Sequence, residues 1–274
     1  AGMGPVADYL QLTKPPIILM LLVTALGGMM VAARGFPTPS SLILVLVGGG
    51  LAAGGASALN HYFDRDIDER MQRTKRRPVA RGSIAPVRAF IFGISLNVFA
   101  VLILGIWVNV FSAILTLGAS LFYVVVYTLW LKRLTTQNIV IGGAAGAMPP
   151  LIGWAGVTGG VELPAFFLFA IIFFWTPPHF WALSLLLRAD YERAGVPMLP
   201  VVSGTLATAR SIMVHSIILV SITMLFLVSQ TVGWIYFLVA IALGTRFLLM
   251  AWRLLKAKGL EGARPLYLYS LLYL

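Results

Sequence analysis

The chain has 274 residues, of which 59% are hydrophobic and only 11% are charged, and its formal net charge is +11. A soluble domain carries about a quarter charged residues, so this composition excludes an ordinary water-soluble protein. The chain has no cysteine, which excludes disulfide bonds and thiolate metal sites. The positive charge alone would suit nucleic acid, but no basic and aromatic reading surface is present, and basic membrane proteins usually carry this charge on cytoplasmic loops.

Apolar stretches of roughly 20 residues recur along the whole chain. Each is long enough to cross about 30 Å of hydrocarbon as a helix, and helix is expected because lipid offers no partner for unpaired backbone groups. The sequence therefore predicts an all-α integral membrane protein with one domain over residues 1–274. A truncated ninth helix would begin near Pro265, after eight spans at about 16–34, 40–60, 87–107, 109–130, 138–157, 164–186, 211–230 and 232–253.

Basic residues lie almost entirely on alternate connections between these spans. Eighteen of the 20 share one side, whereas the opposite side holds only Arg34, and Arg246 lies within the eighth span. The positive-inside rule places the charged side in the cytoplasm, and a prokaryotic plasma membrane is the expected location. Two connections on this side are longer than the topology needs, at about 61–86 and 187–210, and we expect them to form charged caps.

The stretch NHYFDRDIDERMQRTKRRPVARG, residues 60–82, holds four of the nine acidic residues and seven of the 20 basic ones. Asn60, Asp64 and Asp68 are spaced four residues apart, so on a continuous helix they share one face. Two carboxylates and an amide oxygen gathered there repel one another unless a cation lies between them. Oxygen ligands of this kind suit Mg²⁺, which commonly binds through one or two carboxylates plus substrate phosphates.

Basic residues follow the acidic ones directly, at Arg73, Lys75, Arg76, Arg77 and Arg81. Guanidinium groups match phosphate oxygens and stay charged at any working pH. This order of acidic and basic residues predicts a Mg²⁺–diphosphate site. The alternative is a solvated loop whose acids only neutralise its bases, and Asp66 and Glu69, which fall off the shared face, suit that description. The regular spacing of the three oxygen ligands favours the site.

The second long connection also carries acidic and basic residues, but fewer of them. The stretch LRADYERAGVPMLPV places Arg188, Asp190 and Tyr191 at the end of the sixth predicted helix. A lone aspartate at a helix end is usually a surface residue. If Asp190 faced the first cluster across a cleft, it would complete a site for a second metal ion.

At these residues the chain resembles a known family. Its first charged stretch resembles the first aspartate-rich motif of the UbiA-type intramembrane prenyltransferases. The stretch WTPPHFWALSLLLRADYERAGVPMLPV is similar to the protohaem IX farnesyltransferase (haem O synthase) branch, and YTLWLKR, GGAAGAMPPLIGW and LTKP also fit it, over nearly the whole chain. One departure concerns the second D-x-x-x-D of many superfamily members, because Asp190 is followed four residues later by Ala194.

The resemblance implies a UbiA-type bundle of about nine transmembrane helices around a membrane-embedded cavity. It also implies a Mg²⁺-dependent reaction in which haem b, farnesyl diphosphate and water give haem O and diphosphate, and it makes haem A synthase or an oxidase-assembly protein a candidate partner. Metal binding and catalysis would fall to Asn60, Asp64, Asp68 and Asp190, with Arg77 and Arg81 assisting catalysis. The residues expected to bind diphosphate are Lys75, Arg77, Arg81, Tyr127, Lys132 and Arg188.

His179 lies inside an apolar predicted helix, in WTPPHFW. An ionisable group within a membrane is a functional candidate, and neutral imidazole is a common haem ligand. Together with the family resemblance, this leads us to expect that His179 and Trp175 contact haem, with iron ligation and orientation by a hydrogen bond both left open. The alternative is that His179 caps backbone groups freed by Pro177 and Pro178.

Other functions are less well supported by the sequence. A transporter would show broken helices and polar groups at the midplane, whereas the charge here lies at one membrane face. A phosphatidyl-alcohol transferase would carry a D-G-x-x-A-R lead into its aspartates, which is missing. Among prenyltransferases, the second choice of acceptor is a quinone precursor or a chlorophyll-like ring.

Overall fold

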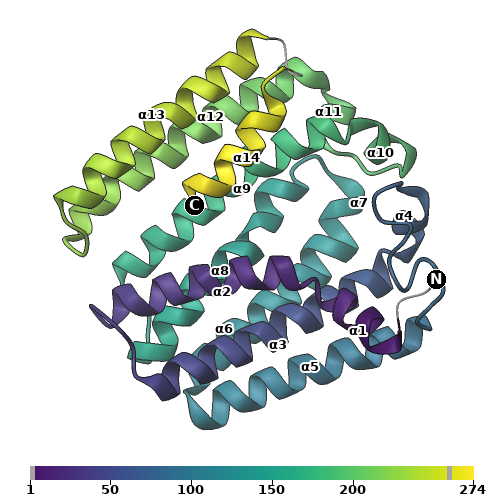
Figure 1. Ribbon diagram of the computed structural model, residues 1–274, viewed down its shortest axis with the longest axis horizontal. Coiled ribbons are helices and arrows are strands. Elements are labelled where there is room, and N and C mark those ends of the chain that lie inside the picture. Colours follow the sequence, from purple (N-terminus) through teal and green to yellow (C-terminus); the bar gives the residue numbers. More distant parts are fainter. Residues whose placement is uncertain (1–3, 258–260) are drawn as a thin grey trace. The chain divides into compact units, whose positions relative to one another are not determined.

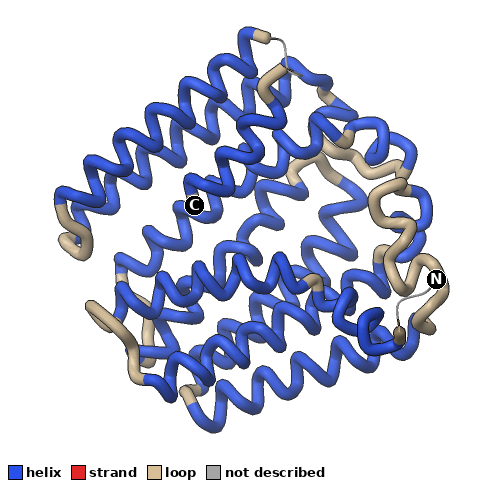
Figure 2. The backbone as a smooth tube through the Cα atoms, viewed as in Figure 1, coloured by secondary structure: helices blue, strands red, loops and turns tan. Residues whose placement is uncertain are grey.

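The computed structural model describes residues 4–257 and 261–274, and within them every regular element is a helix (Figure 2). Several long helices begin at a proline, which suits the first helical position because its missing N–H needs no intrahelical partner there. The helices labelled in Figure 1, with two further segments η1 and η2, are α1 (Pro5–Thr13), α2 (Pro15–Ala32), α3 (Pro39–Phe63), α4 (Arg65–Arg70), α5 (Pro86–Trp107), α6 (Val110–Leu121), η1 (Phe122–Leu131), α7 (Lys132–Leu134), α8 (Asn138–Thr158), α9 (Leu163–Leu186), α10 (Arg188–Arg193), α11 (Leu199–Val202), α12 (Gly204–Leu225), η2 (Phe226–Ser229), α13 (Trp234–Lys256) and α14 (Ala263–Tyr273).

Within the described residues, eight segments are long and apolar enough to cross a membrane. Two of them combine several elements: α6, η1 and α7 form the span Val110–Leu134, and α12 with η2 forms Gly204–Ser229. The eight predicted spans are confirmed, and the seventh begins earlier than expected because α12 extends through the more polar residues before position 211. The last helix, α14, begins two residues before the predicted Pro265. The protein is a multi-pass, all-α membrane protein.

The outer face of α5 shows how these helices meet lipid. Val87, Ile91, Val98 and Ile106 are each more than half exposed, and they recur at helical spacing. In water such a stripe would drive aggregation, whereas here the acyl chains of the bilayer solvate it. The exposed apolar side chains therefore mark the lipid-facing surface.

The described residues form two compact units, which we describe separately. Unit 1 comprises Ala1–Leu131 and Met148–Ala165, and unit 2 comprises Lys132–Ala147 and Phe166–Leu274, so that α8 and α9 contribute to both. The expectation of a single functional domain stays a prediction. The two predicted caps hold short helices: α4 lies in 61–86, and α10 and α11 lie in 187–210.

In unit 1, α3 is the central helix and contacts α1, α2, α5, α6 and η1. Its closest neighbour is α5, where two glycines face each other. A Cβ on Gly55 would lie 2.7 Å from the carbonyl oxygen of Gly93, and one on Gly93 would lie 2.9 Å from that of Gly55. Small residues permit this close helix approach, which membrane helices use where no hydrophobic driving force exists between them. The packing holds the polar end of α3 in place.

Unit 2 contains α9 from Phe166 onward, the short helices α10 and α11, and then α12, η2, α13 and α14. In Figure 1, α12 and α13 run side by side in the green to yellow-green part of the chain, and they pack against each other along their lengths. A Cβ on Gly244 would lie 2.7 Å from Cγ1 of Val220, so this pair is also closely packed. The yellow α14 contacts α13 and bonds to α9 through side chains described below.

Candidate active site

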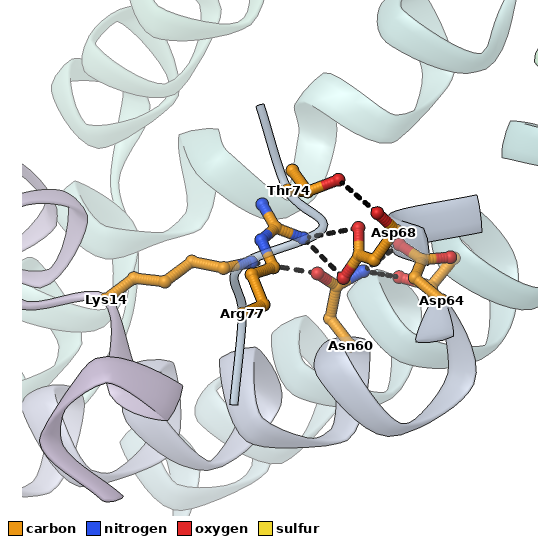
Figure 3. A network of polar contacts seen from close by, with 7 residues as sticks. Lys14, Asn60, Asp64, Asp68, Thr74 and Arg77 are labelled. Carbon is orange, nitrogen blue, oxygen red and sulfur yellow. Dashed lines mark hydrogen bonds and ion pairs between the residues drawn. The ribbon is translucent and has the colours of Figure 1, made fainter. Parts of the chain in front are cut away.

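The acidic cluster of unit 1 forms where α3 passes into α4. Asn60 lies in the last turn of α3, Asp64 joins the two helices, and Asp68 lies in α4. Backbone hydrogen bonds continue through the junction: the N–H of Asp64 donates to the Asn60 carbonyl at 2.9 Å, and the N–H of Asp68 donates to the Asp64 carbonyl at 2.8 Å. The three side chains are 3%, 0% and 2% exposed and lie together (Figure 3). The spacing had predicted this shared face, and Asp66 and Glu69, predicted to fall off it, are exposed.

Hydrogen bonds fix the orientation of the Asn60 amide. Its Nδ2 donates to Oδ2 of Asp64 at 2.6 Å and to Oγ1 of Thr128 at 3.2 Å. Its Oδ1 accepts from Nζ of Lys14 at 2.8 Å (Figure 3). These bonds show that Nδ2 of Asn60 faces the Asp64 carboxylate and that Oδ1 of Asn60 faces the Lys14 ammonium. The Asn60 oxygen is therefore already placed to serve a positive charge.

Thr128 reaches Asn60 from η1, a π-helix of ten residues. The Thr128 hydroxyl donates to the carbonyl of Tyr123 at 3.0 Å, so it accepts the bond from Asn60. Thr128 is fully buried. Its neighbour Tyr127, predicted to bind diphosphate, is half-buried and stacks on Tyr123 with ring centroids 5.5 Å apart. π-helical segments are uncommon and often occur at functional sites, which agrees with the position of η1 beside the cluster.

A second cation contacts the other end of the cluster. Nη1 of Arg77 lies 2.8 Å from Oδ1 and 2.9 Å from Oδ2 of Asp68. The backbone carbonyl of Asp68 accepts from the hydroxyl of Thr74 at 3.2 Å, which ties the loop after α4 back onto the helix (Figure 3). Arg77 was predicted to bind diphosphate, and in this structure it pairs with a predicted metal ligand. One guanidinium therefore sits at the acidic cluster itself.

Sequence reasoning missed two members of this network. Lys14 had served only as a topology charge and as part of LTKP, yet it lies between α1 and α2 with a left-handed backbone, φ 54°, and reaches Asn60. A non-glycine residue in that conformation is uncommon, but the sequence carries no signal for it beyond the prolines that follow. Thr128 lies within YTLWLKR, one of the stretches that fit the family, but nothing in the apolar sequence around it singled out this residue.

Arg81, the other predicted catalytic arginine, has a different partner. It forms a salt bridge with Asp8 of α1, which is 4% exposed. The pair ties the first helix to the loop after α4. Lys75, predicted to bind diphosphate, is exposed on the same loop. Arg81 and Lys75 thus both lie on the loop that follows α4. Their part in diphosphate binding stays a prediction.

In unit 2, His179 lies in α9 with 7% exposure. Its Nδ1 is 2.7 Å from Oγ of Ser270, and Nε1 of Trp175 donates to the Ser270 carbonyl at 2.7 Å. The Trp175 and His179 rings stack with centroids 4.2 Å apart. The alternative role of capping its own helix is not what the structure shows, because the partner of His179 comes from α14.

The family of the chain follows from its similarity to known proteins. The UbiA prenyltransferase family matches residues 21–272. The chain belongs to the UbiA prenyltransferase family. A curated relative in this family, the protoheme IX farnesyltransferase of Gloeobacter violaceus, is 52% identical over 97% of this chain and 88% of its own. The relative of the same name from Chloroflexus aurantiacus is 50% identical over 98% of this chain, and the chain spans only 46% of that longer protein.

Solved structures agree on the UbiA fold. The structure reported for digeranylgeranylglyceryl phosphate synthase in membranes matches with a TM-score of 0.82 over 99% of this chain and 95% of its own, at 17% identity. A UbiA homologue from Archaeoglobus fulgidus bound to GPP and Mg²⁺ matches with a TM-score of 0.76 over 97% of this chain and 96% of its own, at 17% identity. At this identity the likeness establishes the fold.

The remaining predicted site residues of this UbiA-family chain lie in unit 2. Asp190 of α10 is 8% exposed and forms a salt bridge with Arg193 in the next turn. Arg188 begins the same short helix and is exposed, and Lys132 begins α7 and is half-buried. The structure places each residue within its unit. Their assignment to diphosphate, and that of Asp190 to a metal, stay predictions.

The residues of the acidic cluster fit a magnesium ion. Among residues 4–257 and 261–274, no group of three or more His, Cys, Asp or Glu side chains is arranged to hold a metal. The cluster instead offers two buried carboxylates and the Asn60 oxygen, which is an all-oxygen set of the kind that Mg²⁺ accepts when water and phosphate complete its coordination. Lys14 and Arg77 already direct positive charge at these same atoms. The donor chemistry therefore suits a divalent cation.

Proposed function

We propose that this protein transfers the farnesyl group of farnesyl diphosphate to a vinyl group of haem b, giving haem O. The observation that carries the proposal is the 52% identity, over 97% of the chain, to a relative named protoheme IX farnesyltransferase. Support from the chain itself comes from the buried oxygen cluster of unit 1 and from the basic loop that follows it. An identity this high over nearly the whole chain favours a shared substrate pair over a quinone precursor or another ring as the acceptor.

The proposed metal ligands are Asn60, Asp64 and Asp68, with Asp190 for a second ion. The same fold in the Archaeoglobus homologue is described with GPP and Mg²⁺, which supports a metal-dependent transfer here. When bound, Mg²⁺ would neutralise negative charge on the departing diphosphate. The chain's own part is to hold three oxygen ligands in one buried group, with the Asn60 amide oriented by Thr128 and Asp64.

The proposed diphosphate contacts come from the basic loop and from the ends of later helices. Arg77 presents further N–H groups besides the one on Asp68, so a single guanidinium can contact the cluster and a phosphate together. Such preorganised donors stabilise charge that develops as the C–O bond breaks. The full proposed set is Lys75, Arg77, Arg81, Tyr127, Lys132 and Arg188.

The proposed reaction balances as follows. The bond between farnesyl C1 and the diphosphate oxygen breaks, and the electron pair leaves with diphosphate. A new bond forms between farnesyl C1 and the terminal carbon of a haem vinyl group. Water adds its oxygen to the other vinyl carbon and releases a proton, which the departing diphosphate can take. His179 and Trp175 are the proposed contacts of the haem.

The proposed setting is a prokaryotic plasma membrane with the charged connections in the cytoplasm. The bacterial sources of the relatives support the membrane, and the asymmetry of basic residues supports the orientation. Haem O is a membrane-bound intermediate by its chemistry, since farnesylation adds a long apolar chain. A haem A synthase or an oxidase-assembly protein is the proposed recipient.

The test compares acceptors. Purified protein is incubated with farnesyl diphosphate, Mg²⁺ and either haem b or a phenolic acid, and the release of diphosphate is measured. We expect release that depends on haem b and on Mg²⁺. Diphosphate release with the phenolic acid but not with haem b would show that the acceptor is a quinone precursor. No release with any acceptor, together with uptake of substrate into vesicles, would favour a transporter.

A further inference from the structure

The imidazole of His179 is enclosed by aromatic rings from α9 and α14. The Trp175 ring lies 4.2 Å from it, centroid to centroid, with an interplanar angle of 18°, and the Tyr267 ring lies 4.8 Å away at 30°. Two near-parallel rings at these separations cannot share one face, so they cover opposite faces of the imidazole. The ring of Phe180 meets it edge-on, with centroids 5.5 Å apart. Only the edge of the imidazole is left for a further ligand.

Hydrogen bonds at Ser270 select the tautomer of His179. The Ser270 hydroxyl donates to the Tyr267 carbonyl at 2.6 Å, and a hydroxyl has one hydrogen to donate. Toward Nδ1 of His179, at 2.7 Å, the Ser270 oxygen must therefore accept. Nδ1 carries the hydrogen, and in a neutral imidazole Nε2 then carries the lone pair. No hydrogen-bond partner of Nε2 is present in the described part of the chain.

We propose that Ser270 is a positioning residue, which holds His179 as the Nδ1–H tautomer so that Nε2 ligates the haem iron. The inference deepens the proposed function and rests on it. An imidazole with both faces covered cannot stack on a porphyrin, and an Nε2 without hydrogen cannot donate to a propionate. The Nε2 lone pair is left to bind an electron-pair acceptor such as the haem iron, and ligating histidines commonly donate their other N–H in this way.

A second contact holds Ser270 itself in place. Its carbonyl accepts from Nε1 of Trp175 at 2.7 Å, so the residue is fixed to α9 by both its side chain and its backbone. Trp175 thus acts twice, covering one face of the imidazole and anchoring the residue that sets its tautomer. This gives Trp175 a role at the haem end that does not require it to touch haem.

The chain offers a matched control in Ser216 of α12. Both serines are fully buried, and both donate to a carbonyl of their own helix, Ser216 to Ile212 at 2.7 Å. Substitution by alanine removes the same kind of intrahelical bond at both positions. Only Ser270→Ala also removes the contact to His179, so the difference between the two variants isolates that contact.

The experiment titrates ferric haem b into the purified full chain in detergent and follows the Soret band. Wild type and Ser216→Ala should show the spectrum of a nitrogen-ligated haem. His179→Ala should lose it, and added imidazole should restore it. Ser270→Ala should bind haem about tenfold or more weakly, as other substitutions behind a ligating histidine do, and Ser270→Thr, which keeps the hydroxyl, should recover most of the affinity.

Two results would overturn the inference while leaving haem as the acceptor: haem affinity in Ser270→Ala equal to that of Ser216→Ala, or a bound wild-type spectrum without a nitrogen ligand. A wild type that binds no haem would instead remove the haem assignment on which the inference rests. The tautomer can also be read directly by ¹⁵N NMR of the haem-free wild type, since the chain has only three histidines. Hydrogen on Nδ1 of His179 is expected, and hydrogen on Nε2 would contradict the proposal without any substitution at Ser270.

Discussion

At the scale of single residues, the proposed chemistry rests on two buried carboxylates, Asp64 and Asp68. Removing an ion from water costs several kcal/mol even after a protein relaxes around it, so buried acids need a compensating charge. Asp68 has Arg77 against both of its oxygens, and Asn60, which bonds to Asp64, accepts from Lys14. Both ends of the cluster thus already face positive charge, which is the environment that a divalent cation would also supply.

Replacing either carboxylate by its isosteric amide should remove most of the activity. Asp64→Asn and Asp68→Asn each keep the side-chain volume but remove one of the two negative charges of the cluster. We expect turnover to fall by at least about a hundredfold, since charge stabilisation by a metal is worth several kcal/mol. The measurement is farnesyl transfer at limiting Mg²⁺. Asp66→Asn, at an exposed neighbouring position, is the control and should stay near wild type. Near-normal rates in both cluster variants would rule out the metal site.

Arg77→Lys should fail although it conserves charge. One guanidinium nitrogen of Arg77 already contacts both oxygens of Asp68, and the remaining N–H groups are the ones proposed for diphosphate. The single ammonium of a lysine cannot contact the Asp68 carboxylate and the diphosphate in one plane as a guanidinium can. Because a charge-assisted hydrogen bond is worth roughly 1.5–3 kcal/mol, the KM for farnesyl diphosphate should rise about tenfold. Arg76→Lys, on the exposed part of the loop, should change little. Equal KM values for the two variants would make Arg77 an ordinary topology charge.

At the scale of elements, η1 contributes a buried hydrogen-bond acceptor to the cluster. A π-helix places side chains at angles that an α-helix of the same length does not, and here it brings Thr128 to the Asn60 amide. At the α3–α4 junction, backbone hydrogen bonds continue from one helix to the next and keep Asp64 and Asp68 on the same side as Asn60. Two irregular elements therefore build the site, while the regular helices around them provide the packing.

Thr128→Val should weaken Mg²⁺ binding because it removes the acceptor that orients Asn60. Leaving a buried amide hydrogen without a partner costs about 1–3 kcal/mol, so we expect affinity to drop by about tenfold in calorimetry with Mg²⁺ and a non-hydrolysable diphosphate. Thr116→Val is the control, since Thr116 is also buried and, among the described residues, its hydroxyl bonds only to the Ser112 carbonyl of its own helix. An identical Mg²⁺ affinity in both variants would show that Thr128 does not orient Asn60.

At the scale of the whole molecule, sequence reasoning succeeded where the information is local. Hydropathy alone identified the spans, because each helix satisfies its own backbone in lipid, and regular spacing identified the shared face of Asn60, Asp64 and Asp68 at the α3–α4 junction. Contacts between distant residues were not predictable. Lys14 meets Asn60 across 46 positions, Thr128 meets it across 68, and Ser270 meets His179 across 91. Each is a common polar residue whose role arises only when the helices pack.

The proposed orientation rests on the distribution of basic residues and can be tested with single cysteines, because the 274-residue chain has none. Arg76→Cys lies on the basic loop after α4, and Phe36→Cys lies between α2 and α3, where the side chain is 83% exposed. In intact spheroplasts, a membrane-impermeant maleimide should label Phe36→Cys at once and Arg76→Cys only after permeabilisation. The reverse pattern would place the basic loops outside.

The proposed reaction adds both a farnesyl group and water to haem b. The most direct measurement is mass spectrometry of the porphyrin product formed from haem b and farnesyl diphosphate in H₂¹⁸O. We predict a haem that gains one farnesyl group and one hydroxyl containing ¹⁸O, and that is absent with Asp64→Asn. Unchanged haem under conditions where another acceptor is prenylated, or a farnesylated haem without ¹⁸O, would rule out this reaction.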